Sequence, residues 1–292
     1  MNALILAAAC GYGAIMGSFL NVCVFRLPRR CLRIWRPKLS FCPACTRTIP
    51  WKENLPLLSY LALLGKCRGC RAPIPFRYFL VELATTVFFG VTAAEYLLVA
   101  PEERAWGVAI VQALLFAALL VCALVDWDHY IIPDEIDIPG FLIAPFVCAL
   151  VPDLLVRKLG WLGEPRLDAA VTSALGALVG AALVWTVRAI ATRLAGREAM
   201  GFGDVKFLAM IGGFVGWQGA LSAFFLACVV GSFYGIARWL RGGDNVVSFG
   251  PWLAVGGGLF GFVPAVQGLC LGVLDRYAGL FQLLRELLSW KR

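Results

Sequence analysis

Acidic side chains at the ends of long apolar segments are the first feature of this sequence that could perform chemistry. Asp126 closes one apolar run, and Asp204 follows Gly201 and Gly203 at the start of another, 78 positions further along the chain. Ionisable groups at membrane depth are costly to hold there, so each one is a candidate functional group. Two aspartates that share a proton can activate water and protonate a leaving amine without a metal or a covalent intermediate.

Helix geometry distinguishes the four carboxylates of the first acidic cluster. Asp126 and Asp128 are about 200° apart around a helix, so both cannot face one partner. Asp134 and Glu135 follow Pro133 at the beginning of a helix, where acids complement the helix dipole and act as caps. Asp126 lies at a helix C-terminal end, where negative charge is disfavoured. Its placement therefore needs an explanation other than capping.

The helix dipole also predicts separate roles for the two aspartates. Asp204, at a helix N-terminus, is the easier to ionise and is expected to act as the base, although a simple N-cap is its alternative reading. Asp126, at a C-terminus, is expected to keep its proton and act as the acid. Gly201 and Gly203 are expected to support the site by letting the backbone turn and another helix approach. Lys206 either steadies the ionised Asp204 or reaches a lipid headgroup.

Four cysteines in a basic loop form a second candidate site. The pairs Cys42–Cys45 and Cys67–Cys70 have CxxC spacing and are separated by 21 residues. Two such turns supply the four thiolates of a structural Zn²⁺ site with no open position for catalysis. The metal would supply folding energy that a loop of about 50 residues cannot obtain from burial. Disulfides, redox use and an empty site are the alternatives, although a cytoplasmic compartment keeps thiols reduced.

The elements that position these residues are apolar helices. Of 292 residues, 61% are apolar and 15% are charged, and the mean hydropathy is +0.81, whereas soluble domains have about 45–50% apolar and about 25% charged residues. Lipid offers backbone groups no other partners, so helices are the expected spanning form. The sequence predicts an all-α polytopic membrane protein with about eight transmembrane helices. They are expected at 3–25, 78–100, 104–125, 136–156, 167–192, 205–217, 219–240 and 252–274.

The positive charge is concentrated between Arg26 and Arg77. This loop has twelve Lys or Arg and one acid, Glu53, a net charge of about +11. A short basic loop beside a transmembrane helix marks the cytoplasmic side and attracts anionic lipid headgroups, so nucleic acid is not the expected partner. With this loop inside, counting eight spans places Asp126 and Asp204 on the same, cytoplasmic side. The predicted domains are 1–25, the first transmembrane helix; 26–77, a zinc-ribbon-like loop domain; 78–275, the helical membrane domain; and 276–292, an interfacial helix.

Several further motifs occur in one order along nearly the whole chain. They are Gly17-Ser-Phe-Leu-Asn-Val, Arg26-Leu-Pro, Cys42-Pro-Ala-Cys45, Pro50-Trp-Lys-Glu-Asn-Leu-Pro56, Ser59-Tyr60, Gly65-Lys-Cys67, Arg77-Tyr-Phe-Leu-Val-Glu-Leu83, Asp126…Pro133-Asp134, Gly201-Phe-Gly-Asp204-Val-Lys206 and Phe249-Gly-Pro251. Together they resemble the type IV prepilin peptidases, which are GxGD-type intramembrane aspartyl proteases of the bacterial inner membrane.

The resemblance implies an activity and its site. Asp126 and Asp204 match the family's catalytic aspartates. Enzymes of this family cut prepilins and pseudopilins after glycine at the cytoplasmic face, and methylate the new N-terminal residue with S-adenosylmethionine. The methyl-transfer half rests on the resemblance only, because the sequence has no strand–GxGxG–helix pattern. No residue can be assigned to the methyl donor from the sequence.

Other functions would need other residues or other uses of the same ones. His129 is the only histidine, so His-based triads and His-rich metal sites lack residues. Serine–lysine catalysis has Lys206 near the membrane but no serine placed to partner it. A proton- or cation-coupled transporter could use the same carboxylates, because broken helices and membrane acids suit that function as well. A zinc-ribbon scaffold is a further alternative, and it would keep its function without Asp126 and Asp204.

Overall fold

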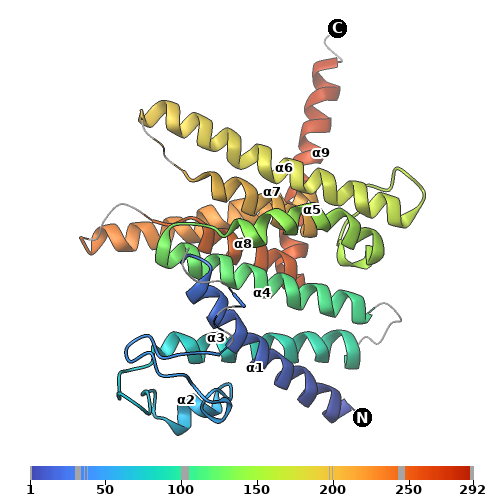
Figure 1. Cartoon of the computed structure of the whole chain (residues 1–292). Helices are drawn as coiled ribbons and strands as arrows, with labels where there is room; N and C mark the ends of the chain where they lie inside the picture. Colours follow the sequence, from blue (N-terminus) through green and yellow to red (C-terminus); the bar gives the residue numbers. More distant parts are fainter. Residues whose placement is uncertain are drawn as a thin grey trace. The chain divides into compact units, whose positions relative to one another are not determined.

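A computed structural model describes residues 2–29, 34–35, 37, 39–99, 105–196, 198, 200–242 and 247–289, with side chains except at 97–99, 105 and 278–289 (Figure 1). Within these residues the chain is helical and forms no strand beyond two isolated bridges, which confirms the predicted all-α fold. The elements are α1 (Asn2–Arg26), η1 (Trp51–Glu53), α2 (Leu58–Ala62), α3 (Phe76–Ala93), η2 (Ala94–Val99), α4 (Ala105–His129), α5 (Asp134–Leu150), η3 (Pro152–Leu154), α6 (Pro165–Ala195), α7 (Phe202–Leu240), α8 (Gly250–Phe262) and α9 (Pro264–Ser289).

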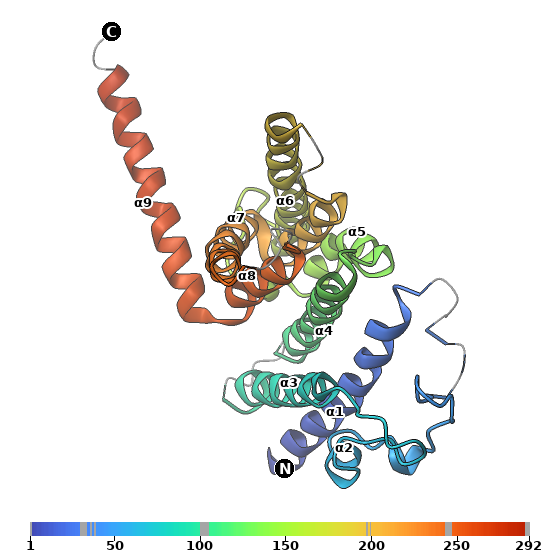
Figure 2. The same ribbon diagram turned by 90° about the vertical axis from the view of Figure 1, so that its left-hand side faces the viewer.

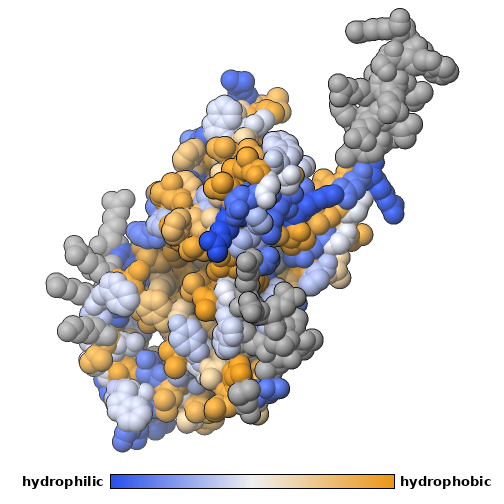
Figure 3. All heavy atoms as spheres, turned by 90° about the vertical axis from the view of Figure 1, so that its right-hand side faces the viewer, coloured by the Kyte–Doolittle hydropathy of each residue, from blue (hydrophilic) through white to orange (hydrophobic). Residues whose placement is uncertain are grey.

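Several of these helices are long and apolar enough to cross a membrane. In the described part of the chain there are five, at Asn2–Arg26, Phe76–Tyr96, Trp106–His129, Pro165–Ala195 and Phe202–Leu240, or up to six if the bent pair α8 and α9 forms one broken span. Hydrophobic side chains cover much of the face drawn in Figure 3. Exposed apolar surface of this kind suits contact with lipid. The predicted count of eight spans is not confirmed.

Two backbone breaks lie inside apolar runs. α7 is interrupted at Gly216, whose φ of 77° and ψ of 174° suit glycine. This break separates the predicted segments 205–217 and 219–240. The predicted segment 252–274 is wrong as a single helix, because the axis bends by 95° between α8 and α9 (Figure 2). Pro264 begins α9 and has no N–H group to continue the hydrogen bonds of α8.

The chain divides into two compact units, Met1–Pro133 and Asp134–Arg292. The domain boundaries predicted from the sequence were set by expected membrane position and not by packing, and they stay a prediction. In the first unit α1 packs closely on α3 because α1 has glycine at the contact. A Cβ atom at Gly17 would lie 2.6 Å from Glu82 Cα, and one at Gly13 would lie 2.7 Å from the Thr85 carbonyl oxygen. Small residues at such contacts are the usual means of close helix packing in membranes.

The second unit is built around α7, with α6 lying along it (Figure 1). A Cβ atom at Gly180 of α6 would lie 2.5 Å from the Leu208 carbonyl oxygen, so the two backbones are almost in contact. α5 and α8 also pack on α7, where a Cβ atom at Gly213 would lie 2.8 Å from Ala144 Cβ. This packing fixes the beginning of α7, where Asp204 lies.

Candidate active site and metal centre

Asp126 lies in the last turn of α4 and is buried, with 6% of its surface exposed. The helix ends at His129, and Tyr130, with a φ of 56°, donates its N–H to the Asp126 carbonyl oxygen at 2.9 Å. Asp128 has a different environment, because Arg77 Nη1 lies 2.7 and 2.6 Å from its two carboxylate oxygens. The structure thus gives the two aspartates the separate surroundings that helix geometry predicted.

Asp204 is the third residue of α7 and is also buried, with 7% of its surface exposed. Gly201 is the N-cap residue, so the alternative reading of Asp204 as an N-cap is wrong, although a carboxylate in the first turn still complements the helix dipole. Gly201 has φ −68° and ψ 151°, a conformation open to any residue. The conformation at Gly201 therefore does not require glycine. A Cβ atom there would be 3.7 Å from Asp204 Oδ2, which is an ordinary van der Waals contact, so Gly201 lies beside the carboxylate.

Lys206 forms an ion pair that was not predicted from the sequence. Its Nζ donates to Asp134 Oδ1 at the start of α5, 72 positions earlier in the chain. This contact ties the beginning of α5 to the beginning of α7. The ring of Phe202 lies beside two cations, with the Lys206 ammonium and the Arg188 guanidinium each 5.9 Å from its centroid. Asp134 therefore does more than cap a helix, and Lys206 has a partner other than a headgroup.

Asp137 is a buried acid that sequence reasoning missed. It lies one turn after Asp134 on α5, it is fully buried, and neither of its carboxylate oxygens has a hydrogen-bond partner among the described residues. The sequence carried a usable signal, because Asp137 falls inside the predicted segment 136–156 and ionisable groups at that depth are functional candidates.

The four cysteines of the basic loop meet as predicted. All four Sγ atoms lie within 4.8 Å of one another, and Cys42 Sγ is 3.9 Å from Cys70 Sγ. Tetrahedral Zn²⁺ with bonds of about 2.3 Å places its sulfur ligands about 3.8 Å apart. A disulfide would need an Sγ–Sγ distance of about 2.05 Å, and the structure forms no disulfide among these four cysteines. The donor set and its spacing fit a structural zinc ion.

The two cysteine turns have matching backbone geometry. The N–H of Thr46 donates to the Cys42 carbonyl oxygen at 2.8 Å, and the N–H of Arg71 donates to the Cys67 carbonyl oxygen at 2.9 Å. Thr46 and Arg71 have φ values of 56° and 58°. Backbone N–H groups of Cys70 and Gly69 lower the pKa of the Cys67 thiol to about 6, whereas desolvation and the neighbouring thiols raise the pKa of Cys70 to about 11. A thiolate at neutral pH is the form that binds metal.

Comparisons with known proteins cover both units. Residues 12–96 match the bacterial peptidase A24 N-terminal domain, and residues 113–236 match the type IV leader peptidase family. Three relatives are named prepilin leader peptidase/N-methyltransferase. The protein of Pseudomonas aeruginosa is 37% identical, with 84% of this chain and 86% of the relative covered. That of Aeromonas hydrophila is 34% identical with the same coverage, and that of Burkholderia pseudomallei is 34% identical over 86% of this chain and 83% of the relative.

No solved structure matches the chain. The relatives, together with the apolar helices, identify an integral membrane protein. The second matched region, 113–236, contains both Asp126 and Asp204, and the first contains all four clustered cysteines. The match therefore accounts for both candidate sites, and the chain belongs to the type IV leader peptidase family.

Proposed function

We propose that this protein is an aspartyl endopeptidase of the membrane that removes the leader peptide from type IV prepilins or pseudopilins. Cleavage is after glycine, and the enzyme then N-methylates the new N-terminal residue with S-adenosylmethionine. The observation that carries the proposal is a pair of buried aspartates at helix ends, both inside the region that matches the leader peptidase family. Relatives that are named for this activity match most of the chain.

The two aspartates divide the proton transfers of amide hydrolysis. Asp204, in the first turn of α7, is the ionised base, and its carboxylate takes a proton from water as the water oxygen attacks the scissile carbonyl carbon. Asp126, in the last turn of α4, is the acid and gives its proton to the leaving nitrogen as the C–N bond breaks. Lys206 and Asp134 hold the start of α7, and so support Asp204.

The cysteine cluster has a structural role in this proposal. Four sulfur ligands leave Zn²⁺ no open position, so the metal stabilises the loop and takes no part in hydrolysis. The basic charge of the loop supports a place at the cytoplasmic face of the bacterial inner membrane, against anionic lipid headgroups and without nucleic acid. Gly201 and Gly203 are assigned to support of the aspartate site.

The alternatives have less support. A transporter would use the same carboxylates, but relatives matching most of the chain are named for leader cleavage and methylation, not transport. A zinc-ribbon scaffold would not need acids buried in helix ends.

Intact mass measurement of a purified prepilin tests the proposal. The reconstituted enzyme is incubated with the prepilin, with and without S-adenosylmethionine. We expect loss of the leader in both reactions and a gain of one methyl group only with the methyl donor. An uncut prepilin would contradict the peptidase assignment, and a cut but unmethylated product would contradict the methyltransferase assignment.

A further inference from the structure

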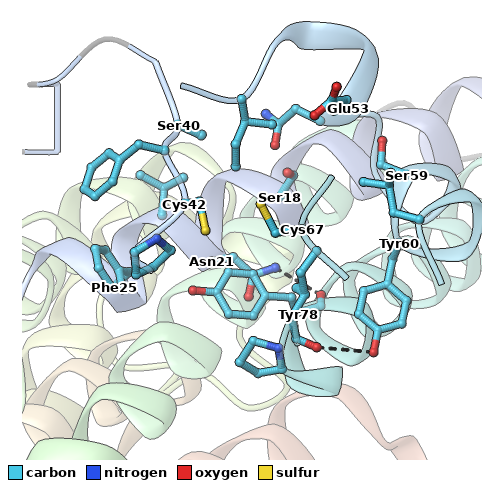
Figure 4. Close-up of a pocket in the computed structure, with 18 of the residues that line it drawn as sticks. Ser18, Asn21, Phe25, Ser40, Cys42, Glu53, Ser59, Tyr60, Cys67 and Tyr78 are labelled. Atoms are coloured by element: carbon cyan, nitrogen blue, oxygen red, sulfur yellow. Dashed lines mark hydrogen bonds between the residues drawn. The ribbon is translucent and has the colours of Figure 1, made fainter. Parts of the chain in front are cut away.

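A cavity of about 500 Å³ lies in the first unit between α1, the cysteine loop and the start of α3 (Figure 4). Its wall includes Asn21 from α1, Tyr60 from α2 and Tyr78 from α3, together with Cys42 and Cys67 of the cysteine cluster. Cavities of roughly 300–1,000 Å³ with mainly apolar walls and a few polar groups are typical binding sites for small molecules. The volume is large enough for a nucleoside-sized ligand.

The arginines that line this cavity already have partners. Arg26 donates to the carbonyl oxygens of Ile34, Pro37 and Leu39 at 2.7, 2.8 and 3.3 Å. Arg68 pairs with Glu53 at 3.4 Å, and Arg77 pairs with Asp128 at 2.6 Å. Their positive charge is therefore directed to the protein itself rather than to a ligand.

Glu82 is the carboxylate of the wall that has no cationic partner among the described residues. Its Oε2 accepts a hydrogen bond from the Leu57 N–H at 2.7 Å, and the Ser18 hydroxyl also donates to the carboxylate. The side chain is partly buried at the contact between α1 and α3. A partly buried carboxylate beside an open volume favours a cationic ligand, because desolvation makes an unpaired charge costly.

Two further features of the cavity wall, its aromatic rings and a hydroxyl group, indicate what kind of cationic ligand would fit. The rings of Phe25, Tyr60 and Tyr78 line the cavity (Figure 4), and aromatic faces bind both flat heterocycles and cations. Ser59 also lines it, and its buried Oγ has no hydrogen-bond partner among the described residues. A ligand with a flat ring, a positive charge and hydroxyl or amino groups would satisfy all these features.

We propose that this cavity is the binding site for S-adenosylmethionine, with Glu82 binding one of its two positive groups and Ser59 one of its polar groups. The inference rests on the proposed methyl transfer. Besides its carboxylate, the donor carries a purine, a ribose diol, an ammonium and a sulfonium, and these groups match the aromatic rings, the Ser59 hydroxyl and the Glu82 carboxylate of the wall. When bound, the donor supplies a methyl carbon to the substrate amine: the nitrogen lone pair forms the new bond, the C–S pair returns to sulfur, and the amine proton leaves to water.

Direct binding of S-adenosylmethionine to the full-length, zinc-loaded protein without prepilin tests the site. Calorimetry compares wild type, Glu82→Gln and the control Glu95→Gln, which changes an exposed carboxylate of the same unit outside the cavity. We expect Glu82→Gln to weaken binding about 10- to 100-fold, the value of a hydrogen bond to a charged group, and Glu95→Gln to bind like wild type. Equal affinity of Glu82→Gln and wild type would overturn the assignment.

Photo-crosslinking of radiolabelled donor to the wild-type protein gives a second readout that does not depend on a variant folding. Peptide mapping is expected to place the label within residues 18–26, 40–63 or 67–82, which include the cavity wall. Label confined to residues outside these ranges would show that this cavity is the wrong site while leaving the methyltransferase assignment intact. A wild-type protein that binds no donor would overturn both.

Discussion

Replacing Asp204 or Asp126 by asparagine is expected to lower the rate of leader cleavage by about 10²- to 10⁴-fold, the contribution of a positioned general acid or base. Asparagine keeps the shape of the side chain but can neither take a proton from water nor give one to the leaving nitrogen. Both residues are buried, so bulk solvent cannot replace them. The measurement is the initial rate of prepilin cleavage by each purified variant, with its thermal unfolding compared with wild type.

Asp128→Asn is the matched control, because Asp128 is only two residues from Asp126 but its carboxylate pairs with Arg77. The change removes the ion pair with Arg77, which is partly exposed and stabilises the fold by about 0–1 kcal/mol. We expect this variant to keep most of the cleavage activity. A loss as large as that of Asp126→Asn, or a wild-type rate in Asp204→Asn, would contradict the assigned roles.

Cys42→Ser is expected to abolish zinc binding and unfold the cysteine loop. Structural zinc sites contribute about 10–16 kcal/mol of binding energy in small peptides, more than this loop can obtain from its own core. The backbone bonds that link Cys42 to Thr46 and to Arg47 would then be lost. Metal content per chain and the rate of tryptic cleavage between residues 40 and 75 measure the effect. Binding of the methyl donor should fall as well, since Cys42 lines the proposed cavity.

Cys270→Ser serves as the control for this change. Cys270 is a reduced cysteine of α9 outside the four-cysteine cluster. This variant should retain the metal and the tryptic resistance of the loop. A Cys42→Ser protein with a full complement of zinc, or a wild-type protein without zinc, would refute the structural metal site.

Helices and their ends were predictable where the signal is local. Pro133 separates α4 from α5, and Gly216 interrupts α7, both at breaks expected from residue type. The bend before Pro264 was not predicted, because residues 252–274 form one apolar run. Apolar composition alone does not distinguish a straight helix from two helices at a sharp angle. The backbone geometry at Pro264 decides between them.

In the candidate sites, too, features formed by neighbouring residues were predictable, whereas features that depend on helix packing were not. The cysteine cluster follows from two CxxC turns, each formed by neighbouring residues. The pairs Lys206–Asp134 and Arg77–Asp128 join residues 72 and 51 positions apart, so they depend on how helices pack.

The burial of individual side chains could not be predicted from the sequence either. The predicted segment 136–156 placed Asp137 within an apolar helix, but it did not show which side of that helix is packed against the protein, and the carboxylate is fully buried. The wall of the cavity is drawn from α1, the cysteine loop and α3, which only the tertiary fold brings together.

Chemical cross-linking of positions 126 and 204 tests the central claim most directly. Carboxylates that share one water, each within about 2.6–3.2 Å of it, lie roughly 5 Å apart. The test protein carries Asp126→Cys and Asp204→Cys, and its cysteines outside the zinc cluster are replaced by alanine. A short bifunctional thiol reagent should therefore join positions 126 and 204 in the folded state. Failure of both short and long reagents to join them, in a protein that still binds zinc and the methyl donor, would contradict a shared catalytic site.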